Sequence, residues 1–407
     1  MTGRIRQIVN RLKKSIPPTV RQSSFSFWPR KTAAGVVVDA DNALEIDSVL
    51  TCVRVLAESM AALPLNLLER DGDKMVSKAD KHPVYELIRW QPNEEMTAYE
   101  FRIWLMVDCL IRGNGVAQVQ RSNKGVPLAL WPLEANQLSL KRAPGNGRLL
   151  YVYRTGSKTE ALLEANEVLH IRTFMTGGLM GLSLVDKQRA MLGSAKAAND
   201  YSSEFFANGH VLTGTLDVPT ELSEPAYNRL KEDWNEWHSG TGNRHKSPML
   251  EGGTKFTPIV LNHEESQLLE TRKFQRSTIA GLFRVPAHMI NDLEKATFSN
   301  IEHQDLGFVK HTLRPWMTNW EQRLRLTLLG KEDRETHFFK HNDRDLLRGD
   351  LPSRFAAYGT GIQSGFMSPN DARLIEDMNP FRGGDVHLIN GAMQRVNDIA
   401  NGKEDNE

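Results

Sequence analysis

The sequence has 407 residues, of which 40% are hydrophobic and 25% are charged. Single hydrophobic cores stop growing at about 250 to 300 residues, so this chain has one large core or two to three smaller ones. The apolar content excludes a wholly disordered or collagen-like chain. The longest nearly apolar run, residues 101–111, contains Arg102 and Asp108 and is shorter than the ~20 residues of a membrane-spanning helix. A soluble protein without membrane contact is expected.

The charges are unevenly distributed along the chain. Residues 1–38 contain eight Lys or Arg residues and no acidic residue, which leaves 43 basic and 50 acidic residues, a net charge of −7, for the rest. Such a segment binds nucleic acid, an anionic membrane or an acidic protein, or is a solvated leader in which Pro17 and Pro18 interrupt any helix. Residues 1–40 are therefore expected to be a basic, disordered N-terminal arm, and its role stays open between these alternatives.

The two cysteines, Cys52 and Cys109, are too few for a disulfide framework or a four-cysteine zinc site. An apolar signal region followed by a small-residue cleavage site is not recognisable at the start of the sequence. Synthesis and assembly in the cytoplasm are the expectation that follows.

The first part of the chain mixes helical and strand-like patterns. Apolar residues recur at helical spacing from Asp47, the expected cap, to Pro64, and a hairpin is expected around the turn at residues 71–73. Thr97 and Glu100 have the spacing of a capping box, which predicts a second helix that Gly113 ends. Short β-prone runs follow at 116–119, 138–141, 149–153 and 168–171. An antiparallel sheet and a mixed α+β domain over residues 41–181 are expected.

Two long helices flank a small unit in the second half of the chain. The first is expected over residues 183–207, with a length of about 37 Å at 1.5 Å per residue, and the second over 264–283. The sequence between them predicts a strand, a helix and a strand at 211–216, 223–237 and 256–261. This pattern predicts a stalk of two helices with a small unit at its tip.

The C-terminal third is expected to be mainly helical. Ser299 and Glu302 predict a capping box that opens a helix reaching residue 329, with a kink near Pro315. An alternating run at 336–341 predicts a strand on which His337 and His341 are surface residues rather than metal ligands. Further helices are expected at 351–358 and 369–378, followed by a frayed polar tail.

Motifs of catalysis and cofactor binding are incomplete. The stretch most like a phosphate-binding loop, residues 240–247, follows a helix and has His245 where the second glycine is needed. Gln267 stands where a zinc-protease helix has its second histidine. We therefore expect no enzymatic activity, no cofactor and no metal, while a metal nuclease built from distant acidic residues stays an alternative.

Short strings of residues occur in the order that one family shows. They lie at residues 48–64, 82–83, 91–93, 97–101, 112–115, 167–171, 205–209, 250–253, 270–273, 279–286, 299–302, 312–315, 346–350 and 368–373. Together they resemble the portal (head-to-tail connector) proteins of tailed bacteriophages, of the Hong Kong 97-like family, over about residues 43–385. One string departs from the family's usual Thr-x-Asn-Glu-x-Arg, since Ser368 and Asp371 stand there, but these residues keep the chemistry of a helix start.

The resemblance implies an α+β portal fold. Its parts are a mixed α/β wing, two long stem helices, a small α/β clip inserted between them and a helical C-terminal crown. The implied bounds are 41–181 for the wing, 182–208 for stem helix 1, 209–262 for the clip, 263–285 for stem helix 2, 286–298 for a tunnel loop, 299–345 for a wing helix and strand, 346–395 for the crown and 396–407 for a flexible tail.

The resemblance also implies a function. Portal proteins form a ring, usually a dodecamer, at the unique vertex of a phage capsid, with a channel through which double-stranded DNA is packaged and ejected. The implied partners are the large terminase subunit, the major capsid protein or scaffold and a head–tail adaptor, in the virion and in the host cytoplasm during assembly. The alternatives are a DNA-processing enzyme (a nuclease or a nucleotide-using packaging component) and a capsid adaptor without a channel.

Candidate site residues follow from this layout. A channel that lets DNA slide needs few basic residues, since many fixed phosphate contacts would hold the duplex. The candidates are Lys295, Arg272, Lys273 and Arg276 for the channel, Asn291, Asp292, Glu294 and Thr297 for the tunnel loop, and Trp234, Trp237, Arg244 and Lys246 for motor docking on the clip. For the helix residues the alternative is ion pairing with Glu264, Glu265 or Glu270 of a neighbouring subunit. Trp316 and Trp320 are possible interface anchors too, although core packing is favoured for most of the tryptophans.

Overall fold

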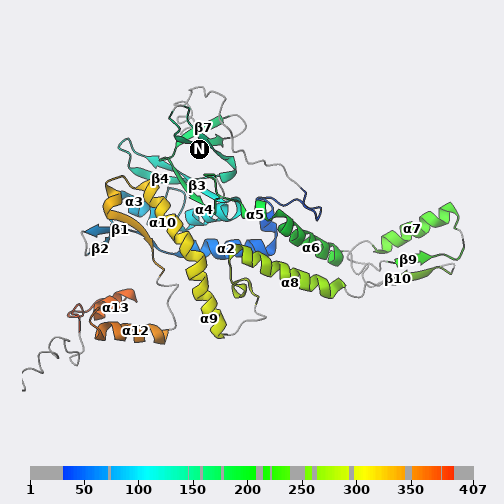
Figure 1. Ribbon diagram of the computed structural model, residues 1–407. Helices are drawn as coiled ribbons and strands as arrows, with labels where there is room; N and C mark the ends of the chain where they lie inside the picture. Colours follow the sequence, from blue (N-terminus) through cyan, green and yellow to red (C-terminus); the bar gives the residue numbers. More distant parts are fainter. Residues whose placement is uncertain are drawn as a thin grey trace, which may run out of the picture. The chain divides into compact units, whose positions relative to one another are not determined.

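The computed structural model describes residues 31–71, 75–144, 146–155, 159–175, 178–207, 214–220, 222–238, 253–258, 264–292, 298–343, 351–376 and 378–388. The chain divides into two compact units, Met1–Asn342 and Asp343–Glu407 (Figure 1). Both helices and antiparallel strands build the first unit, so the fold is mixed α+β. No helix within the described ranges has the length and hydropathy that crossing a membrane requires.

The fold begins before the boundary that the charge pattern predicts. Lys31 forms a β-bridge with Val37, the Thr32 hydroxyl donates to the Val36 carbonyl oxygen at 2.9 Å, and Val38 is buried in the core. The last ten residues of the expected arm, 31–40, are therefore part of the folded unit. Residues 1–30 lie outside the described residues.

Helices α2 (Asp47–Ala62) and α4 (Ala98–Arg112) pack against each other in the core of the first unit. The expected capping box is confirmed, because the Glu100 carboxylate accepts from the Thr97 N–H at 2.8 Å and the Thr97 hydroxyl accepts from the Glu100 N–H at 3.3 Å. Gly113 ends α4 with φ of 80°, a left-handed conformation that favours glycine. The cap of α2 is Ile46 rather than Asp47, whose carboxylate instead accepts from the Ser48 N–H within the first turn.

Three antiparallel sheets accompany these helices. The expected hairpin of β1 (Leu65–Asp71) and β2 (Met75–Lys78) is confirmed, and β11 (His337–His341) pairs with the other edge of β1. The second sheet has the order β4 (Pro127–Leu133), β3 (Asn114–Arg121), β8 (Val168–Arg172), and the third β5 (Leu138–Arg142), β6 (Leu149–Thr155), β7 (Thr159–Glu164). The sequence did not predict β4, β7 or α3 (Pro83–Arg89). The two prolines of β4 argue against a central strand, but an edge strand tolerates them.

A buried polar network fastens the second sheet. His170 Nε2 lies 2.9 Å from Asn114 Oδ1, and its Nδ1 lies 3.2 Å from the Tyr151 hydroxyl. Arg172 donates to both His170 Nδ1, at 3.1 Å, and the Tyr151 hydroxyl, at 3.0 Å. The Asn114 side chain also accepts from the Gly181 N–H at 2.7 Å, which fixes the segment that precedes the long helix at residues 184–207.

One interrupted helical stretch follows where the sequence predicts a single kinked helix. It consists of α9 (Phe298–Gly307), the π-helical segment η4 (Phe308–Leu313) and α10 (Arg314–Leu328). Pro315 has no N–H to donate and its ring displaces the carbonyl group four residues earlier, so the wider π turn lies just before it. The expected irregularity at Pro315 is thus confirmed, in the form of a π segment.

The strand β11 corrects the prediction for its histidines. His341 is 1% exposed, and its Nδ1 lies 3.0 Å from the Glu321 carboxylate of α10. His337 is half-buried at the start of the strand. Because β11 is paired with β1 and covered by α10, its alternating pattern carries His341 into the interior rather than to the surface.

The two long helices lie side by side, as Figure 1 shows. The first is divided into α5 (Leu184–Lys187) and α6 (Arg189–Ala207), because Gln188 leaves the helical conformation with φ of −107° and ψ of 23°. The second, α8 (Glu264–Phe283), has the expected bounds and also packs against α2. Between them in the chain, β9 (Gly214–Asp217), α7 (Glu224–His238) and β10 (Lys255–Pro258) confirm the expected strand, helix and strand.

The second unit contains the two expected helices, α12 (Leu351–Gln363) and α13 (Pro369–Ile375). Ser368 and Asp371 form a capping box at the start of α13, as the sequence predicts. The Glu376 carboxylate accepts from the Tyr358 hydroxyl at 2.7 Å and from Arg354 at 2.5 Å. This carboxylate therefore ties the end of α13 to α12.

Candidate functional site

The candidate channel residues of α8 lie on the side of the helix that continues into the core. At 100° per residue, Arg272 and Arg276 lie within about 20° of the buried Phe283, and the buried Ala280 lies about 80° and 40° from them. Arg272, Lys273 and Arg276 are themselves half-buried. The opposite side of α8 carries Phe274, which is 73% exposed. Among the described residues of α8, Phe274 is thus exposed, whereas the three basic candidates are half-buried.

Lys273 has an acidic partner in its own helix. Its Nζ lies 3.6 Å from the carboxylate of Glu270, one turn earlier. Ion pairs of this exposed, i,i+3 kind contribute at most about 1 kcal/mol, so the pair does not fix the position of the ammonium group. An ion pair between Lys273 and Glu270 is therefore possible within one subunit, without a neighbouring subunit.

The base of the expected tunnel loop is fastened on both sides. Arg284 and Asn291 have left-handed φ values of 57° and 60°, and the Arg284 carbonyl oxygen accepts from the Thr312 hydroxyl at 2.8 Å. His288, in the short helix η3 (Ala287–Ile290), lies 2.8 Å from the Asp305 carboxylate of α9. Asp292 donates its N–H to the Ala287 carbonyl oxygen at 3.0 Å. Glu294, Lys295 and Thr297 lie outside the described residues.

Trp234, a candidate for motor docking, has an internal partner. Its ring lies 5.4 Å from that of Phe256 in β10, and it shares a half-buried stripe of α7 with Ala226 and Leu230. This contact holds α7 on the strand pair. The Trp237 side chain and residues Arg244 and Lys246 lie outside the described residues, so their docking role stays a prediction.

The other tryptophans with helical spacing belong to the core. Trp320 is 2% exposed, and its Nε1 lies 3.3 Å from the sulfur of Met106 in α4. Trp316 packs against the same core cluster. For these two residues the favoured interpretation, core packing, is confirmed.

The described residues contain no cluster of metal ligands, and the two cysteines are unreactive. In the part of the chain that the structure describes, no three His, Cys, Asp or Glu side chains converge as metal ligands would. Cys52 and Cys109 are buried, and burial raises the pKa of the Cys52 thiol to about 12 and raises that of Cys109 as well. A thiol that stays protonated at neutral pH is a poor nucleophile.

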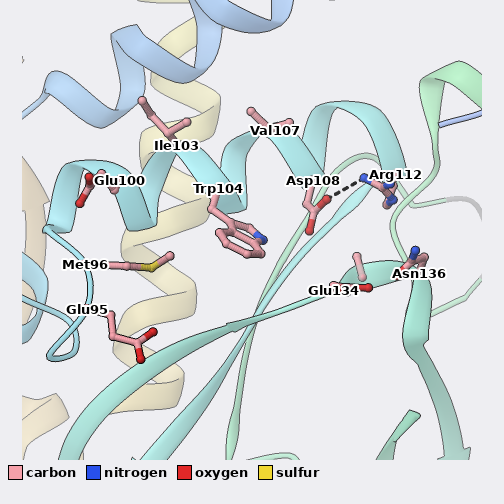
Figure 2. A pocket seen from close by; sticks show the side chains of 11 residues that line it. Glu95, Met96, Glu100, Ile103, Trp104, Val107, Asp108, Arg112, Glu134 and Asn136 are labelled. Carbon is pink, nitrogen blue, oxygen red and sulfur yellow. Dashed lines mark hydrogen bonds and ion pairs between the residues drawn. The ribbon is translucent and has the colours of Figure 1, made fainter. Parts of the chain in front are cut away.

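A groove along α4 was missed by the sequence reasoning. It has a volume of about 630 Å³, and Figure 2 shows the side chains of Ile103, Trp104 and Val107 on it, with Asp108 and Arg112 toward one end. Burial raises the pKa of Asp108, and the Arg112 guanidinium 2.9 Å away partly offsets this shift. Apolar residues occur on all sides of α4, a pattern that predicts a helix buried on every side. The sequence therefore did not reveal that one side of α4 is open to solvent.

Comparisons with known proteins identify the family of this α+β chain. The model of the phage portal protein family matches residues 47–377. The portal protein of Enterobacteria phage HK97 is 31% identical over 371 residues, which cover 90% of this chain and 87% of that protein. The chain belongs to the phage portal protein family.

Solved structures support the fold of this portal protein. A crystal structure of an HK97-family phage portal protein from Corynebacterium diphtheriae matches with a TM-score of 0.54 at 17% identity, over 75% of this chain and 96% of that one. A chain from the neck of a native gene transfer agent particle, computed with C12 symmetry, matches with a TM-score of 0.56 at 21% identity, over 84% and 95%. As a portal protein the chain is a structural component of the virion, at the portal vertex, and not an enzyme.

Proposed function

We propose that this portal protein assembles into a closed ring of twelve subunits with a central channel for double-stranded DNA. The match to the portal family over residues 47–377 carries the proposal. The C12 symmetry of the neck that contains a similarly folded chain supports the subunit number. Packaging and ejection then use the same channel, while the large terminase subunit, the capsid or scaffold protein and a head–tail adaptor bind the ring from outside.

The proposed layout uses the helices and sheets described above. The three-sheet body, with α2, α4 and α10, corresponds to the wing, α6 and α8 to the stem, and the unit of β9, α7 and β10 to the clip. The second unit, with α12 and α13, corresponds to the crown. The continuous chain path from α6 through the strand pair to α8 supports an inserted clip.

A ring whose subunits contact head to tail needs two different complementary surfaces on each subunit. Phe274 on α8 is the proposed anchor for one of these surfaces, because it is 73% exposed and aromatic residues are enriched in interface cores. Tyr201, on the neighbouring helix α6, is also exposed. In the ring, the stem helices of adjacent subunits then cover the aromatic side chains that a single chain leaves in solvent.

The channel itself is proposed to contact DNA weakly. Lys295 of the tunnel loop is the first candidate for centring the duplex, and Arg272, Lys273 and Arg276 are the second group. Arg272, Lys273 and Arg276 are half-buried within one subunit, so they add few fixed positive charges to the channel wall. Weak attraction favours sliding, since each fixed phosphate contact adds affinity through counterion release.

The first test is electron microscopy of the purified protein in negative stain, with two-dimensional averaging. Closed rings with a central hole wide enough for duplex DNA are expected. Monomers that persist at high protein concentration and after mixing with capsid protein contradict the ring. Assays of nuclease activity and nucleotide hydrolysis then test the alternative of a DNA-processing enzyme, which predicts turnover by the isolated chain.

A further inference from the structure

We propose that the groove along α4 binds the basic N-terminal arm of the same chain, through residues 4–16. The proposal assigns the arm a site on its own subunit, and it does not depend on ring formation. The groove contributes an apolar floor and an acidic rim, and the arm contributes apolar and basic residues in the matching arrangement.

The floor of the groove is apolar and open. Met96, Ile103, Trp104 and Val107 line it, and Trp104 is 42% exposed. In Figure 2 Ile103, Trp104 and Val107 project from α4, and Met96 lies just before the start of this helix. A volume of about 630 Å³ lies within the usual range for binding sites, roughly 300 to 1,000 Å³. A hollow with an exposed tryptophan fits a partner that supplies apolar side chains.

The rim of the groove is acidic. It carries the exposed carboxylates of Glu95, Glu100 and Glu134, a formal charge of −3, while the buried carboxylate of Asp108 is offset by the guanidinium of Arg112. Arg112 is already paired with Asp108 at 2.9 Å and with Asp41 beyond the groove. The rim therefore favours a partner with several positive charges and no acidic residue.

The arm has the complementary pattern. Apolar residues at positions 5, 8, 9, 12 and 16 have the i, i+3, i+4, i+7 spacing that forms one stripe of a helix, and basic residues occupy positions 4, 6, 11, 13 and 14. Pro17 follows directly. As a helix these thirteen residues extend for about 20 Å, close to the ~22 Å of α4. An amphipathic helix in an apolar groove is a common mode of peptide recognition.

The arm is attached near one end of the groove. Lys31 pairs with Val37, and Asp41, four residues further on, is ion-paired with Arg112. The fifteen residues from 16 to 31 reach at most about 50 Å, more than the length of the groove. Because the attachment lies near Arg112, the proposal places Ile16 at the end with Arg112 and Asn136, and Ile5 at the end with Met96. A short tether gives an effective concentration of about 1 mM, which favours this arm over that of a neighbour.

Disulfide trapping in the full-length protein tests the placement. One double variant carries Ile5→Cys with Met96→Cys, and a second carries Ile16→Cys with Asn136→Cys. The control pairs Ile5→Cys with Leu326→Cys, at a residue of α10 that is 57% exposed and outside the groove. The native Cys52 and Cys109 are buried with raised thiol pKa values and do not compete.

We expect both groove pairs to form crosslinks at least tenfold faster than the control pair, at the mass of a monomer under denaturing conditions. Adding Glu95→Lys to the first pair, or raising the salt concentration to 1 M, is expected to slow the reaction, since both weaken the charge attraction. Equal rates for groove and control pairs overturn the proposal. Crosslinks that appear only at the mass of a dimer overturn it as well, because they place the arm on a neighbouring chain.

Discussion

The body and the stem helices differ in how completely one chain buries their large side chains. In the body, Trp320 is 2% exposed and packs against Met106, whereas Phe274 on stem helix α8 is 73% exposed. Tyr201 on α6 is exposed as well. The body therefore has a large core of its own, although Trp90 and Phe174 on its surface are also exposed, while α8 has a buried C-terminal end and an exposed aromatic side chain further back. Stability of the subunit and assembly of the ring are expected to depend on different residues.

The largest effect on stability is expected from Trp320→Ala in the body. Replacing a fully buried aromatic side chain by alanine costs about 3 to 5 kcal/mol, because contacts are lost and a cavity remains. The free energy of unfolding, measured with urea, is expected to fall by this amount.

Leu326→Ala is the matched control, since Leu326 lies on the same helix and is exposed. Its effect is expected to stay within about 0.5 kcal/mol. If Trp320→Ala lowers the free energy of unfolding no more than Leu326→Ala does, Trp320 does not contribute to the core. The contrast between the two regions then does not hold.

Phe274→Ser is expected to weaken the ring and leave the subunit stable. Aromatic residues at the centre of interfaces contribute about 2 kcal/mol or more, which corresponds to a roughly 30-fold loss of affinity per contact. The mass distribution in solution, measured by light scattering or mass photometry, is expected to shift from rings to smaller species at equal concentration. An unchanged distribution removes Phe274 from the interface.

Two glycine substitutions sharpen the same contrast. A Cβ atom on Gly181 in the body meets the Gly113 carbonyl oxygen at 1.9 Å, so Gly181→Ala is expected to cost about 1 to 3 kcal/mol. A Cβ on Gly281 of α8 meets no atom within 4 Å, and Gly281→Ala is expected to stabilise the subunit by about 0.5 to 1 kcal/mol. Urea unfolding checks both signs. A gain in unfolding free energy by Gly281→Ala together with a loss of rings would place a neighbouring subunit close to α8.

The sequence predicts best those elements whose signals are local. The capping box at Thr97, the glycine stop at Gly113 and the bounds of α8 follow from a few neighbouring residues. Edge strand β4 was missed because its prolines are tolerated only where a strand has one paired edge, a property of the whole sheet. His341 was assigned to the surface because nothing near it in the sequence reveals that Glu321 of α10 faces it.

The candidate site was predictable only in outline. The order of family strings predicted the two long helices and the small unit between them, but the direction of each side chain depends on packing. Arg272 and Arg276 fall on the core side of α8 because Ala280 and Phe283, further along, set which face is buried. The α4 groove combines residues of α4 with Glu95 and Met96 before it and with residues 134–136, more than twenty positions after it, which no local pattern brings together.

The last effect concerns pH and the buried network of the body. Burial, with the nearby charges of Arg172 and Arg323, holds the pKa of His170 well below its usual range. The unfolded chain then binds a proton near pH 6.5 that the folded chain does not bind, so this contribution to stability is complete above that pH and is lost as the pH falls below it. The loss has a slope of at most about 1.4 kcal/mol per pH unit. His170→Gln is expected to remove this share of the slope, measured by urea unfolding between pH 7 and pH 5, while the slope due to His341, whose pKa is also lowered by burial, persists. An unchanged slope in the variant would mean that His170 takes up its proton as readily in the folded subunit as in the unfolded chain.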